Sequence, residues 1–384
     1  MSKWPMVKLS EIASICAGQG APQGEDNYSN EGLPFIRAGH LIDLIGGVSE
    51  SSLPKINEKV ARKYNLKIQP KDTIVFAKSG MSCMKGYVHQ LRNDCYVVSH
   101  LACIYPKKIH AGYLRRYFEV YRPNRLIKDE AYPSILLSDI SNMLVPLPPL
   151  EEQKRIAAVL DKVQSLIDLR KKQIAEMDML VKAKFIEMFG DIRNSRIYPY
   201  VPIKSIATVI SGGTPSRDIF DYWNGDIRWV KTTELQNCII EDTEEKITHA
   251  GLDNSSAKIC PPSTILIAMY GQGKTRGMTA LLQTECATNQ ACACILPSDS
   301  HNSIYLWHYL MLCYEDLRSK AKGGNQPNLN VEIIKNYTVL LPPIKMQNDF
   351  AAFVEQVDKS KLAKQKALEQ METLYKALMQ QVFS

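Results

Sequence analysis

The chain repeats itself at a nearly constant interval, and this repeat limits the folds that are open to it. The stretch LSEIASICAG, which begins at Leu9, is matched by IKSIATVISG, which begins at Ile203, 194 residues later. Four further matches follow in the same order at intervals of 191 or 194 residues: LPFIRAGHL with IRWVKTTEL, PKDTIVFAKSG with PPSTILIAMYG, LACIYP with CACILP, and VPLPPLEEQ with VLLPPIKMQ. Five ordered matches indicate two copies of one structural unit.

Each copy combines a compact part with a helical part. The compact parts, residues 1–146 and 192–340, contain short apolar runs between loops rich in Gly, Pro, Asn and Ser, followed by helical stretches, and they predict mixed α+β domains. The helical parts, residues 147–191 and 341–384, each predict one long helix. In the first copy the helix follows a Pro-Pro pair and ends near Gly190. Proline is common at the start of a helix and glycine just after its end.

Both long helices carry an apolar heptad seam. On each helix, ten positions are spaced alternately by four and three residues, and eight of these ten are apolar. This is the pattern of a coiled coil. The predicted seam residues are Ile156, Leu160, Val163, Ile167, Ile174, Met177, Val181, Met188, Phe350, Val354, Val357, Leu368, Met371, Tyr375, Leu378 and Val382. The alternative, a helix that lies on its own domain, suits the 39 residues of Glu151–Phe189 poorly because the domain is too small.

Chain connectivity sets the direction of the two helices. The first helix leaves domain one and enters domain two, so the second helix can pack on the first only if it runs back. We therefore predict an α+β protein in which two mixed α/β domains are joined by two long helices in an antiparallel coiled coil, with an internal pseudo-two-fold repeat.

Charge and composition restrict the function. Residues 1–146 contain 19 Lys and Arg against 13 Asp and Glu, whereas residues 192–340 contain 14 of each. The basic excess of the first domain suits a polyanion such as DNA, although a solvated surface is the simpler alternative. The chain shows no apolar stretch that could cross a bilayer and no signal peptide. Ten cysteines without a secretory signal indicate a reducing cytoplasm, where we expect the protein.

One loop raises the question of nucleotide binding. The stretch AMYGQGKTRG, from Ala268 to Gly277, loosely fits the phosphate-loop pattern [AG]-x4-G-K-[ST]. A phosphate loop opens a helix, but the residues after Gly277 lack a helical apolar pattern, and the first copy has no GKT at the equivalent place. The chain also shows no repeated set of acids, histidines or thiols. We therefore expect no enzyme activity, no metal site and no cofactor on this chain.

The first long helix carries a resemblance to a known family. The block VPLPPLEEQKRIAAVLDKVQSLIDLRKKQIAEMDMLVKAKFIEMFGD resembles the central region of type I restriction–modification specificity subunits, and LSEIASICAG, GGTPS and LLPPIKMQ are similar to other landmarks of that family. The resemblance covers essentially the whole chain. The second copy departs from it with Lys345-Met346 where the first has Glu151-Glu152.

The resemblance implies a function and partners. Such a subunit catalyses nothing and binds double-stranded DNA in a phage-defence system. Each domain reads half of a gapped bipartite site, while the helices set the spacing and dock two modification subunits. S-adenosylmethionine and ATP are expected only on partner subunits: the modification subunits carry S-adenosylmethionine for adenine methylation, and restriction (motor) subunits carry ATP. The DNA sequence recognised stays open, as does whether the system restricts or only methylates.

Candidate DNA-binding residues lie in polar and basic glycine loops that follow apolar strands in both copies. Glycine permits close approach, Lys and Arg bind phosphate or guanine, and other polar side chains contact base edges. The candidates are Arg37, Lys78, Ser79 and Lys85 in the first domain, and Thr214, Ser216, Arg217, Lys231, Tyr270, Gln272, Lys274, Thr275, Arg276, Lys322 and Gln326 in the second. Two alternatives remain: a coiled-coil scaffold without sequence-specific DNA binding, and an ATP-binding protein that uses Lys274.

Overall fold

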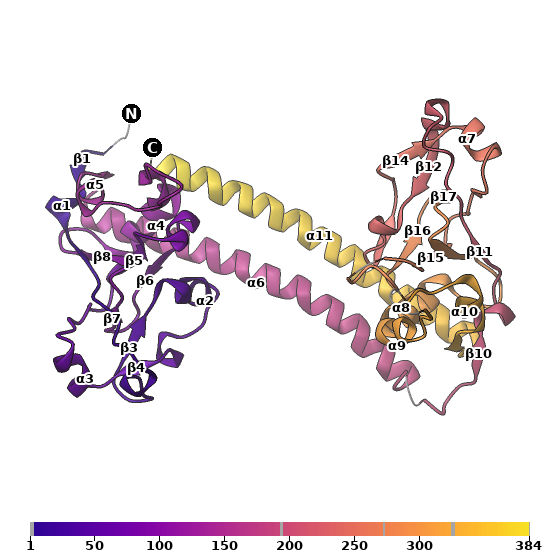
Figure 1. Ribbon diagram of the computed structural model, residues 1–384, viewed down its shortest axis with the longest axis horizontal. Coiled ribbons are helices and arrows are strands. Elements are labelled where there is room, and N and C mark those ends of the chain that lie inside the picture. The colour runs from indigo at the N-terminus through magenta and orange to yellow at the C-terminus, as the bar shows by residue number, and fades with distance from the viewer. Residues whose placement is uncertain (1–3, 193–194, 272, 324–326, 384) are drawn as a thin grey trace. The chain divides into compact units, whose positions relative to one another are not determined.

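The chain divides into two compact units (Figure 1). The computed structural model describes residues 4–192, 195–271, 273–323 and 327–383. The first unit comprises Met1–Lys171 together with Lys366–Ser384, and the second comprises Lys172–Gln365. Each unit therefore contains one globular domain and a part of both long helices.

The globular domain of the first unit contains three small sheets. A four-stranded antiparallel sheet has the order β2-β8-β5-β6, a three-stranded sheet has the order β4-β3-β7, and β1 pairs with β9. The strands are β1 (Met6–Lys8), β2 (Ala13–Ala17), β3 (Leu33–Ile36), β4 (Lys55–Ile56), β5 (Ile74–Ala77), β6 (Val88–Gln90), β7 (Tyr96–Val97), β8 (Leu101–Pro106) and β9 (Leu144–Pro146). The helices and 3-10 turns are α1 (Leu9–Ile12), α2 (Leu41–Ile45), α3 (Glu58–Lys63), α4 (Ala111–Val120), α5 (Leu137–Ser141), η1 (Glu25–Asn27), η2 (Ala38–His40), η3 (Glu50–Ser52), η4 (Met81–Lys85) and η5 (Pro123–Leu126).

The second unit repeats this plan with one added strand. Its sheets have the orders β11-β18-β15-β16-β13, β14-β12-β17 and β10-β19. The strands are β10 (Tyr200–Pro202), β11 (Val209–Ser211), β12 (Trp223–Val230), β13 (Cys238–Ile240), β14 (Glu245–Ile247), β15 (Ile265–Ala268), β16 (Thr279–Leu282), β17 (Ala287–Thr288), β18 (Cys292–Ile295) and β19 (Thr338–Leu340). The helices and 3-10 turns are α7 (His249–Asp253), α8 (Ser303–Leu312), α9 (Tyr314–Ser319), α10 (Val331–Asn336), η6 (Ile203–Ser205), η7 (Phe220–Tyr222) and η8 (Thr232–Glu234).

The sequence repeat is also a repeat of strand register. Ile15 of β2 lies opposite Ile104 in the first domain, and the equivalent Val209 of β11 lies opposite Ile295 in the second. The strands β5 and β15 are equivalent as well, and every residue of both is buried. Burial on both faces explains why these two segments read as continuous apolar runs without alternation.

A buried glutamine explains the repeated motif at the start of each long helix. In the first unit, Gln153 accepts a hydrogen bond from the backbone N–H of His110 at the start of α4 (2.8 Å) and donates one to the carbonyl of Pro148 (2.7 Å). In the second unit, Gln347 makes the same two bonds, to Asn302 (2.9 Å) and Pro342 (2.7 Å). The glutamine therefore fixes the long helix to the helix of its own domain, which is why it is present in both copies.

Each of the two helical regions contains one continuous long helix. Helix α6 (Leu150–Phe189) and helix α11 (Ile344–Phe383) each have 40 residues. Gly190 follows α6 with a φ of 78°, the left-handed conformation that glycine adopts without strain at a helix end. In the described part of the chain, no helix has both the length and the apolar character required to cross a membrane.

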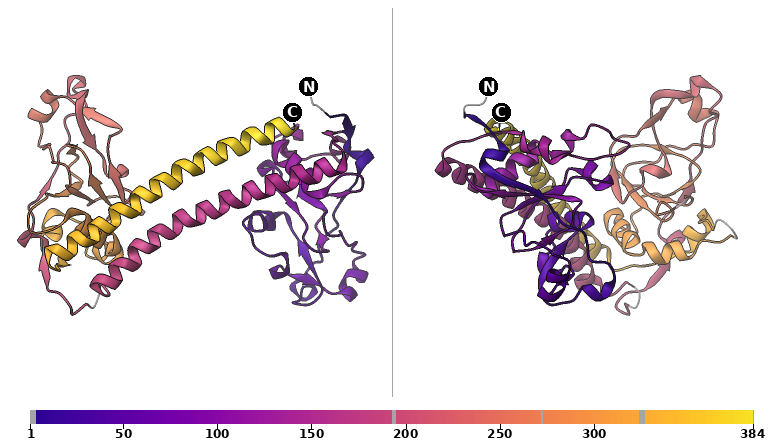
Figure 2. Two further views of the ribbon diagram at one scale, coloured as in Figure 1. Left: turned by 180° about the vertical axis from the view of Figure 1, so that it is seen from behind. Right: turned by 60° about the vertical axis from the view of Figure 1, so that its left-hand side comes forward.

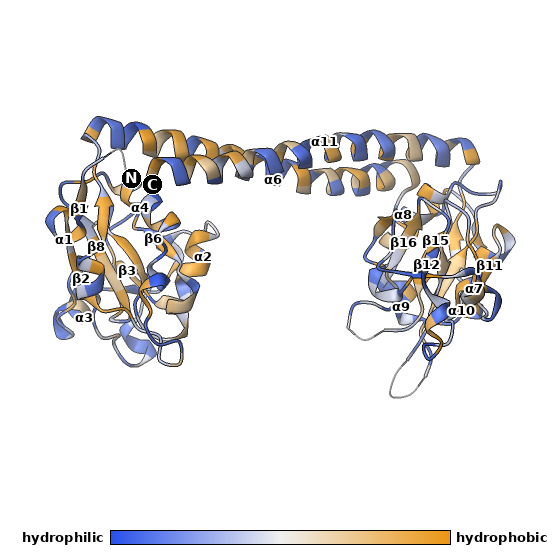
Figure 3. Ribbon diagram, turned by 90° about the horizontal axis from the view of Figure 1, so that it is seen from above, coloured by the Kyte–Doolittle hydropathy of each residue, from blue (hydrophilic) through white to orange (hydrophobic). Residues whose placement is uncertain are grey.

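Within each unit, the segments of α6 and α11 pack side by side in opposite directions. In the first unit, Lys171 forms an ion pair of 2.8 Å with Glu372. In the second unit, Asp178 pairs at 2.6 Å with Lys361, and the ring centres of Phe185 and Phe350 lie 5.2 Å apart. Along these contacts, the residue numbers on α6 rise while those of their partners on α11 fall. The helices are therefore antiparallel, as predicted. Figure 3 shows hydrophobic residues recurring along both helices.

The predicted seam residues are all buried or half-buried. Toward the helix ends, however, the helices also form part of the domain cores. In the first unit, the core contains Ile156, Leu160 and Phe383. The yellow end of α11 lies at the first globular domain (Figure 2), where Tyr121 at the end of α4 donates a hydrogen bond to the carbonyl of Phe383 (3.2 Å). The second core contains Phe185 in the same way. The two alternatives for the helices, packing on each other and lying on a domain, therefore both hold, and at Phe185 they hold together.

Candidate nucleic-acid interface

In the first domain, a cavity of about 440 Å³ lies between the loop after β2, the turn η2 and the loop before β8. Its wall includes Gln23, Tyr28, Arg37 and His100. The guanidinium carbon of Arg37 lies 4.9 Å from the centre of the Tyr28 ring, a cation–π contact that holds the cation at the cavity. Arg37 is exposed, and no carboxylate among the described residues forms an ion pair with it. The cavity therefore offers an aromatic face and a free cation.

Two predicted residues that follow β5 contact His100 in the wall of this cavity. The hydroxyl of Ser79 is 2.9 Å from Nδ1 of His100, which lies in the cavity wall. Lys78 is half-buried and its backbone N–H donates to the carbonyl of His100 (2.9 Å). Lys85 is exposed at the end of η4, next to Gly86 with a φ of 61°. Arg37, Lys78 and Ser79 are thus associated with the cavity, and Lys85 lies on the neighbouring turn.

In the second domain, the loop from Gly271 to Gly277 connects two antiparallel strands, β15 and β16. No helix follows the Gly-Lys-Thr of this loop, so the helix N-terminus that a phosphate loop requires is missing from the described residues here. The side chain of Lys274 is exposed, while its carbonyl accepts a hydrogen bond from the hydroxyl of Tyr314 (2.7 Å). Thr275 is half-buried and Tyr270 is 42% exposed.

Two arginines fix the shape of this loop. Arg318 of α9 donates to the carbonyls of Gly273 (2.5 Å) and Arg276 (3.0 Å). Arg276 itself donates to the carbonyl of Pro327, so its guanidinium is directed at the protein. Arg318 was missed by the sequence reasoning because it stands 45 residues away from Gly273 along the chain.

Two predicted cations on other loops of the second domain, Arg217 and Lys231, are paired with acids. Arg217 forms an ion pair with Glu245 (2.6 Å), and its guanidinium carbon lies 3.7 Å from the Trp223 ring centre. Lys231 pairs with Glu244 (2.8 Å) and Glu245 (3.0 Å), which raises the pKa of the lysine. Partial burial acts to raise the pKa of Glu245, but Arg217 and Lys231 hold it below its usual value. These cations are less available to a polyanion than Arg37.

The remaining predicted residues are placed around these loops. Thr214 donates to the side-chain oxygen of Gln290. Ser216 is exposed, and its carbonyl accepts a hydrogen bond from the indole of Trp223 (3.0 Å). Lys322 is exposed, with its backbone paired to that of Asn328. The predicted Gln272 and Gln326 lie outside the described residues.

The first sequence match ends in a glycine in both copies, Gly18 and Gly212, and packing explains why glycine is needed there. A Cβ on Gly18 would lie 2.2 Å from the carbonyl oxygen of Val97, and one on Gly212 would lie 2.0 Å from that of Thr288. Both distances are far below van der Waals contact, so each position requires glycine. The close approach places the loop after β2 or β11 directly beside the parallel strand pair of its domain.

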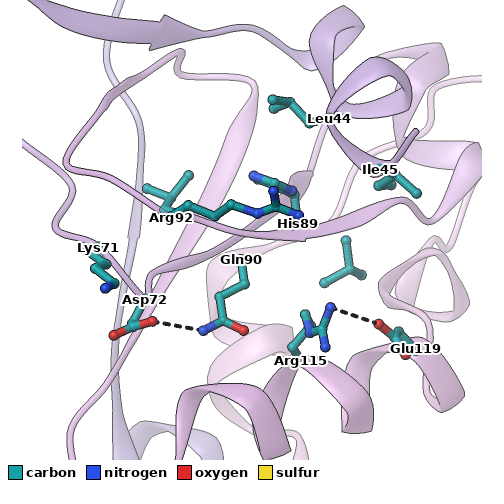
Figure 4. A pocket seen from close by; sticks show the side chains of 11 residues that line it. Leu44, Ile45, Lys71, Asp72, His89, Gln90, Arg92, Arg115 and Glu119 are labelled. Carbon is teal, nitrogen blue, oxygen red and sulfur yellow. Dashed lines mark hydrogen bonds and ion pairs between the residues drawn. The ribbon is translucent and has the colours of Figure 1, made fainter. Parts of the chain in front are cut away.

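A second cavity of the first domain lies between α2, β6 and α4 (Figure 4) and has a volume of about 440 Å³. Its wall contains both signs of charge. Asp72 accepts a hydrogen bond from Gln90 (2.8 Å), and Arg115 approaches Glu119 at 3.9 Å. Lys71 and Arg92 add two exposed cations. Its acids offset part of this charge, as the exposed Glu25 does in the cavity at Arg37.

The described residues contain no group of three or more His, Cys, Asp or Glu side chains arranged to hold a metal ion. Gln23, Tyr28, His100 and Arg318 are residues of the interface that sequence reasoning did not select. A signal for Tyr28 was present, since Tyr222 stands 194 residues later, at the interval of the repeat. His100 and Arg318 had no such signal, because Ala291 stands at the repeat position of His100 and α9 belongs to the second copy alone.

Comparisons with known proteins agree with this architecture. The type I restriction enzyme MjaIX specificity subunit of Methanocaldococcus jannaschii is 21% identical over 400 residues, which cover 98% of this chain and 91% of that protein. The EcoR124I/EcoR124II specificity subunit of Escherichia coli is 21% identical over 231 residues, which cover 58% of this chain and 57% of that protein.

Two solved structures share the fold. The crystal structure of the type I restriction–modification system S subunit from M. genitalium has a TM-score of 0.62 at 12% identity and covers 100% of this chain and 96% of that chain. A chain from a structural study of complex assembly and conformational transition of the type I R-M system has a TM-score of 0.61 at 16% identity, covering 99% and 97%. These likenesses confirm the predicted fold class.

A family model described as the type I restriction modification DNA specificity domain matches residues 1–178 and again residues 198–373. The two matches correspond to the two copies of the repeat and together cover most of the chain. The resemblance seen in the sequence is thereby confirmed, and the chain belongs to the type I restriction–modification DNA specificity family.

Proposed function

We propose that this chain selects the DNA target of a type I restriction–modification enzyme, and that residues 1–146 and residues 192–340 each read one half of a gapped bipartite site. The main support for this proposal is that the two domains share one fold but present different side chains at equivalent positions. Tyr28 corresponds to Tyr222, but Arg37 corresponds to Lys231 and Gln23 to Arg217. Bases are distinguished by the donors and acceptors that reach their edges, so a shared scaffold with different contact residues suits two different half-sites.

The two helical regions, residues 147–191 and 341–384, act in this proposal as the spacer between the half-sites. They also provide the docking surface for two modification subunits, and restriction subunits can join the same assembly. The chain itself supplies recognition alone. S-adenosylmethionine and ATP are used on the partner subunits, and the complex works in the cytoplasm, where its DNA substrate lies.

The test is methylome sequencing of a host that expresses the chain with its modification partner. The expected result is one methylated motif made of two short half-sites with an unread gap. The variant Lys274→Ala should then change or relax one half-site and leave the other half-site and the gap unaltered, because its loop belongs to the second domain alone. A continuous motif, or a variant that changes both half-sites together, would contradict the assignment of one half-site to each domain.

The scaffold alternative is tested separately. A mobility assay with the whole chain and its modification subunits should show a shifted target duplex that an excess of random duplex does not release. If random and target duplexes compete equally well, the chain does not read sequence. For the methylome experiment, the matched control is the same host with the modification subunits but without this chain.

A further inference from the structure

Two cysteines face each other at the edge of the central sheet in the first domain. The strand β2 is the edge strand of that sheet, and its antiparallel register places Cys16 opposite Cys103 of β8. The Cα atoms of opposed residues in antiparallel strands lie about 4.5–5.5 Å apart, and disulfides span about 4.4–6.8 Å. Opposed side chains also point to the same face of the sheet. The two thiols therefore have the spacing that a disulfide needs.

The two thiols differ in exposure and in acidity. Cys16 is exposed, whereas Cys103 is 1% exposed. A hydrogen bond from the Cys103 thiol, helped by a hydrogen bond with the Gln69 side chain and the positive charge of Lys67, lowers the pKa of Cys16 to about 6 against the effect of partial burial. The same hydrogen bond, together with burial, raises the pKa of Cys103 well above its usual value. At neutral pH the exposed sulfur is thus a thiolate, the form that attacks disulfides.

The second domain offers an internal comparison. In the equivalent register, Ile210 of β11 lies opposite Cys294 of β18, so this copy has no thiol at the place of Cys16. Cys294 belongs to a buried cluster with Cys260, Cys286 and Cys292. Burial raises the pKa of Cys286 to about 12. These thiols lack the exposure of Cys16.

We propose that Cys16 and Cys103 form a redox-active dithiol that low-molecular-weight disulfides convert into a cross-strand disulfide. In the first step, the Cys16 thiolate attacks one sulfur of the small disulfide, whose S–S bond breaks, and one small thiolate leaves and takes up a proton. In the second step, Cys103 loses its proton and attacks the Cys16 sulfur, which expels the second small thiol. Two protein thiols are oxidised, and one small disulfide is reduced to two thiols.

The role of each cysteine follows from its position. Cys16 is the attacking sulfur because solvent reaches it. Cys103 is the resolving sulfur because it touches Cys16 but is closed to a bulky oxidant. The product would join the edge strand β2 covalently to β8, just before the loop that leads from Gly18 to the cavity at Arg37. This modification site goes beyond DNA recognition and does not depend on it.

The experiment treats the full-length chain with glutathione disulfide at neutral pH and measures its intact mass and its cross-linked peptides. The wild-type chain should lose two hydrogens, yield a peptide pair joined through Cys16 and Cys103, and return to its original mass with dithiothreitol. Cys103→Ala should stop at a single glutathionyl group on Cys16. Cys16→Ser should give neither product, and Cys294 should stay reduced in every sample.

Several outcomes would overturn the proposal. A stable glutathionyl adduct on Cys16 of the wild-type chain would mean that Cys103 cannot resolve it. A disulfide between other cysteines, such as Cys260 and Cys294, or an unmodified wild-type chain would contradict the assigned pair. As a second measurement, the rate of iodoacetamide alkylation at Cys16 should rise with a midpoint at a pH of about 6. A midpoint at the ordinary thiol value of about 8.5 would refute the thiolate step.

Discussion

At the scale of single residues, the environment of a side chain decides whether it is available to a partner. Arg37 and Lys231 stand at equivalent positions of the repeat, and each comes directly after a strand, β3 or β12. Arg37 is exposed beside Tyr28, whereas Lys231 is held by Glu244 and Glu245. A lysine that is already paired must lose those contacts to bind phosphate, so the free arginine is the stronger candidate.

We expect Arg37→Ala to weaken DNA binding markedly. A lost base contact costs about 1–3 kcal/mol, or roughly five- to 150-fold in affinity. The matched control is Arg62→Ala, which removes the same charge from the exposed surface of α3 in the same domain. Fluorescence anisotropy with the target duplex at fixed salt measures both variants. Equal, small losses in the two variants would mean that Arg37 contributes net charge and nothing specific.

A second residue-scale prediction concerns Glu50, which is buried at 2% exposure in the first domain. One carboxylate oxygen lies 2.8 Å from His89 and accepts the backbone N–H of Arg92 (2.8 Å), and the other accepts the backbone (2.9 Å) and side chain (3.0 Å) of Asn93. Glu50→Ala should lower the free energy of unfolding by about 3 kcal/mol, because several buried donors lose their acceptor. Urea unfolding measures this, and Glu58→Ala on the surface should change it by less than about 0.5 kcal/mol.

The same carboxylate gives the stability a pH dependence. Burial acts to raise the pKa of Glu50, but the hydrogen bonds from His89, Arg92 and Asn93 hold it below its usual value. A carboxylate with a lowered pKa in the folded state stabilises the fold above its unfolded pKa of about 4.3 and loses this contribution as the pH falls through the folded value. Urea unfolding at several pH values should therefore show a steeper loss below about pH 4 in the wild-type chain than in Glu50→Ala.

At the scale of elements, a loop acquires its shape from a helix that is distant in sequence. The loop from Gly271 to Gly277 resembles a phosphate loop in sequence, yet it joins two antiparallel strands. Arg318 and Tyr314 of α9 hold its carbonyls in place. A strand after the loop was foreseeable from the lack of a helical pattern, whereas the contacts with α9 were not, because nothing in the local sequence signals them.

We expect Lys274→Ala and Arg318→Ala to affect the same half-site for different reasons. Lys274→Ala removes an exposed cation, so DNA affinity should fall by about 1–3 kcal/mol while the Tm stays unchanged. Arg318→Ala releases the loop carbonyls and should lower both the specificity for that half-site and the Tm. Calorimetry and methylome sequencing measure the two effects, with Lys320→Ala on the same helix end as the control. Binding of ATP that Lys274→Ala abolishes would instead favour the nucleotide alternative.

At the scale of the whole molecule, the two long helices join the domains and, in our proposal, set the gap between the half-sites. The predicted helix of 39 residues would be roughly 58 Å long at about 1.5 Å per residue. This corresponds to at most about 1.7 turns of B-DNA, which advances roughly 34–36 Å per turn. The ion pairs Lys171–Glu372 and Asp178–Lys361 indicate which stretches of the two helices must be lengthened together.

We expect one added heptad in both helices to lengthen the gap. Insertions after Ile174 and after Leu368 fall between the two ion pairs and keep the seam in phase. Each adds roughly 10 Å of helix, or about three base pairs, with only about 20° of rotational drift. Methylome sequencing should show unchanged half-sites with a gap longer by about two or three base pairs. A folded, active variant that keeps the original gap would show that the helices do not set the spacing.

The sequence by itself determined the repeat, the domain type and the helices. Apolar spacing and backbone propensities are local, so the helix predicted for Glu151–Phe189 is observed as Leu150–Phe189. Side-chain partners depend on residues far away in the chain. Only the tertiary structure decided that Arg217 and Lys231 are paired with acids, that Arg276 is directed inward, and that the helix ends belong to the domain cores. Long-range packing creates these contacts, and neither periodicity nor a local motif encodes which distant residue will be the partner.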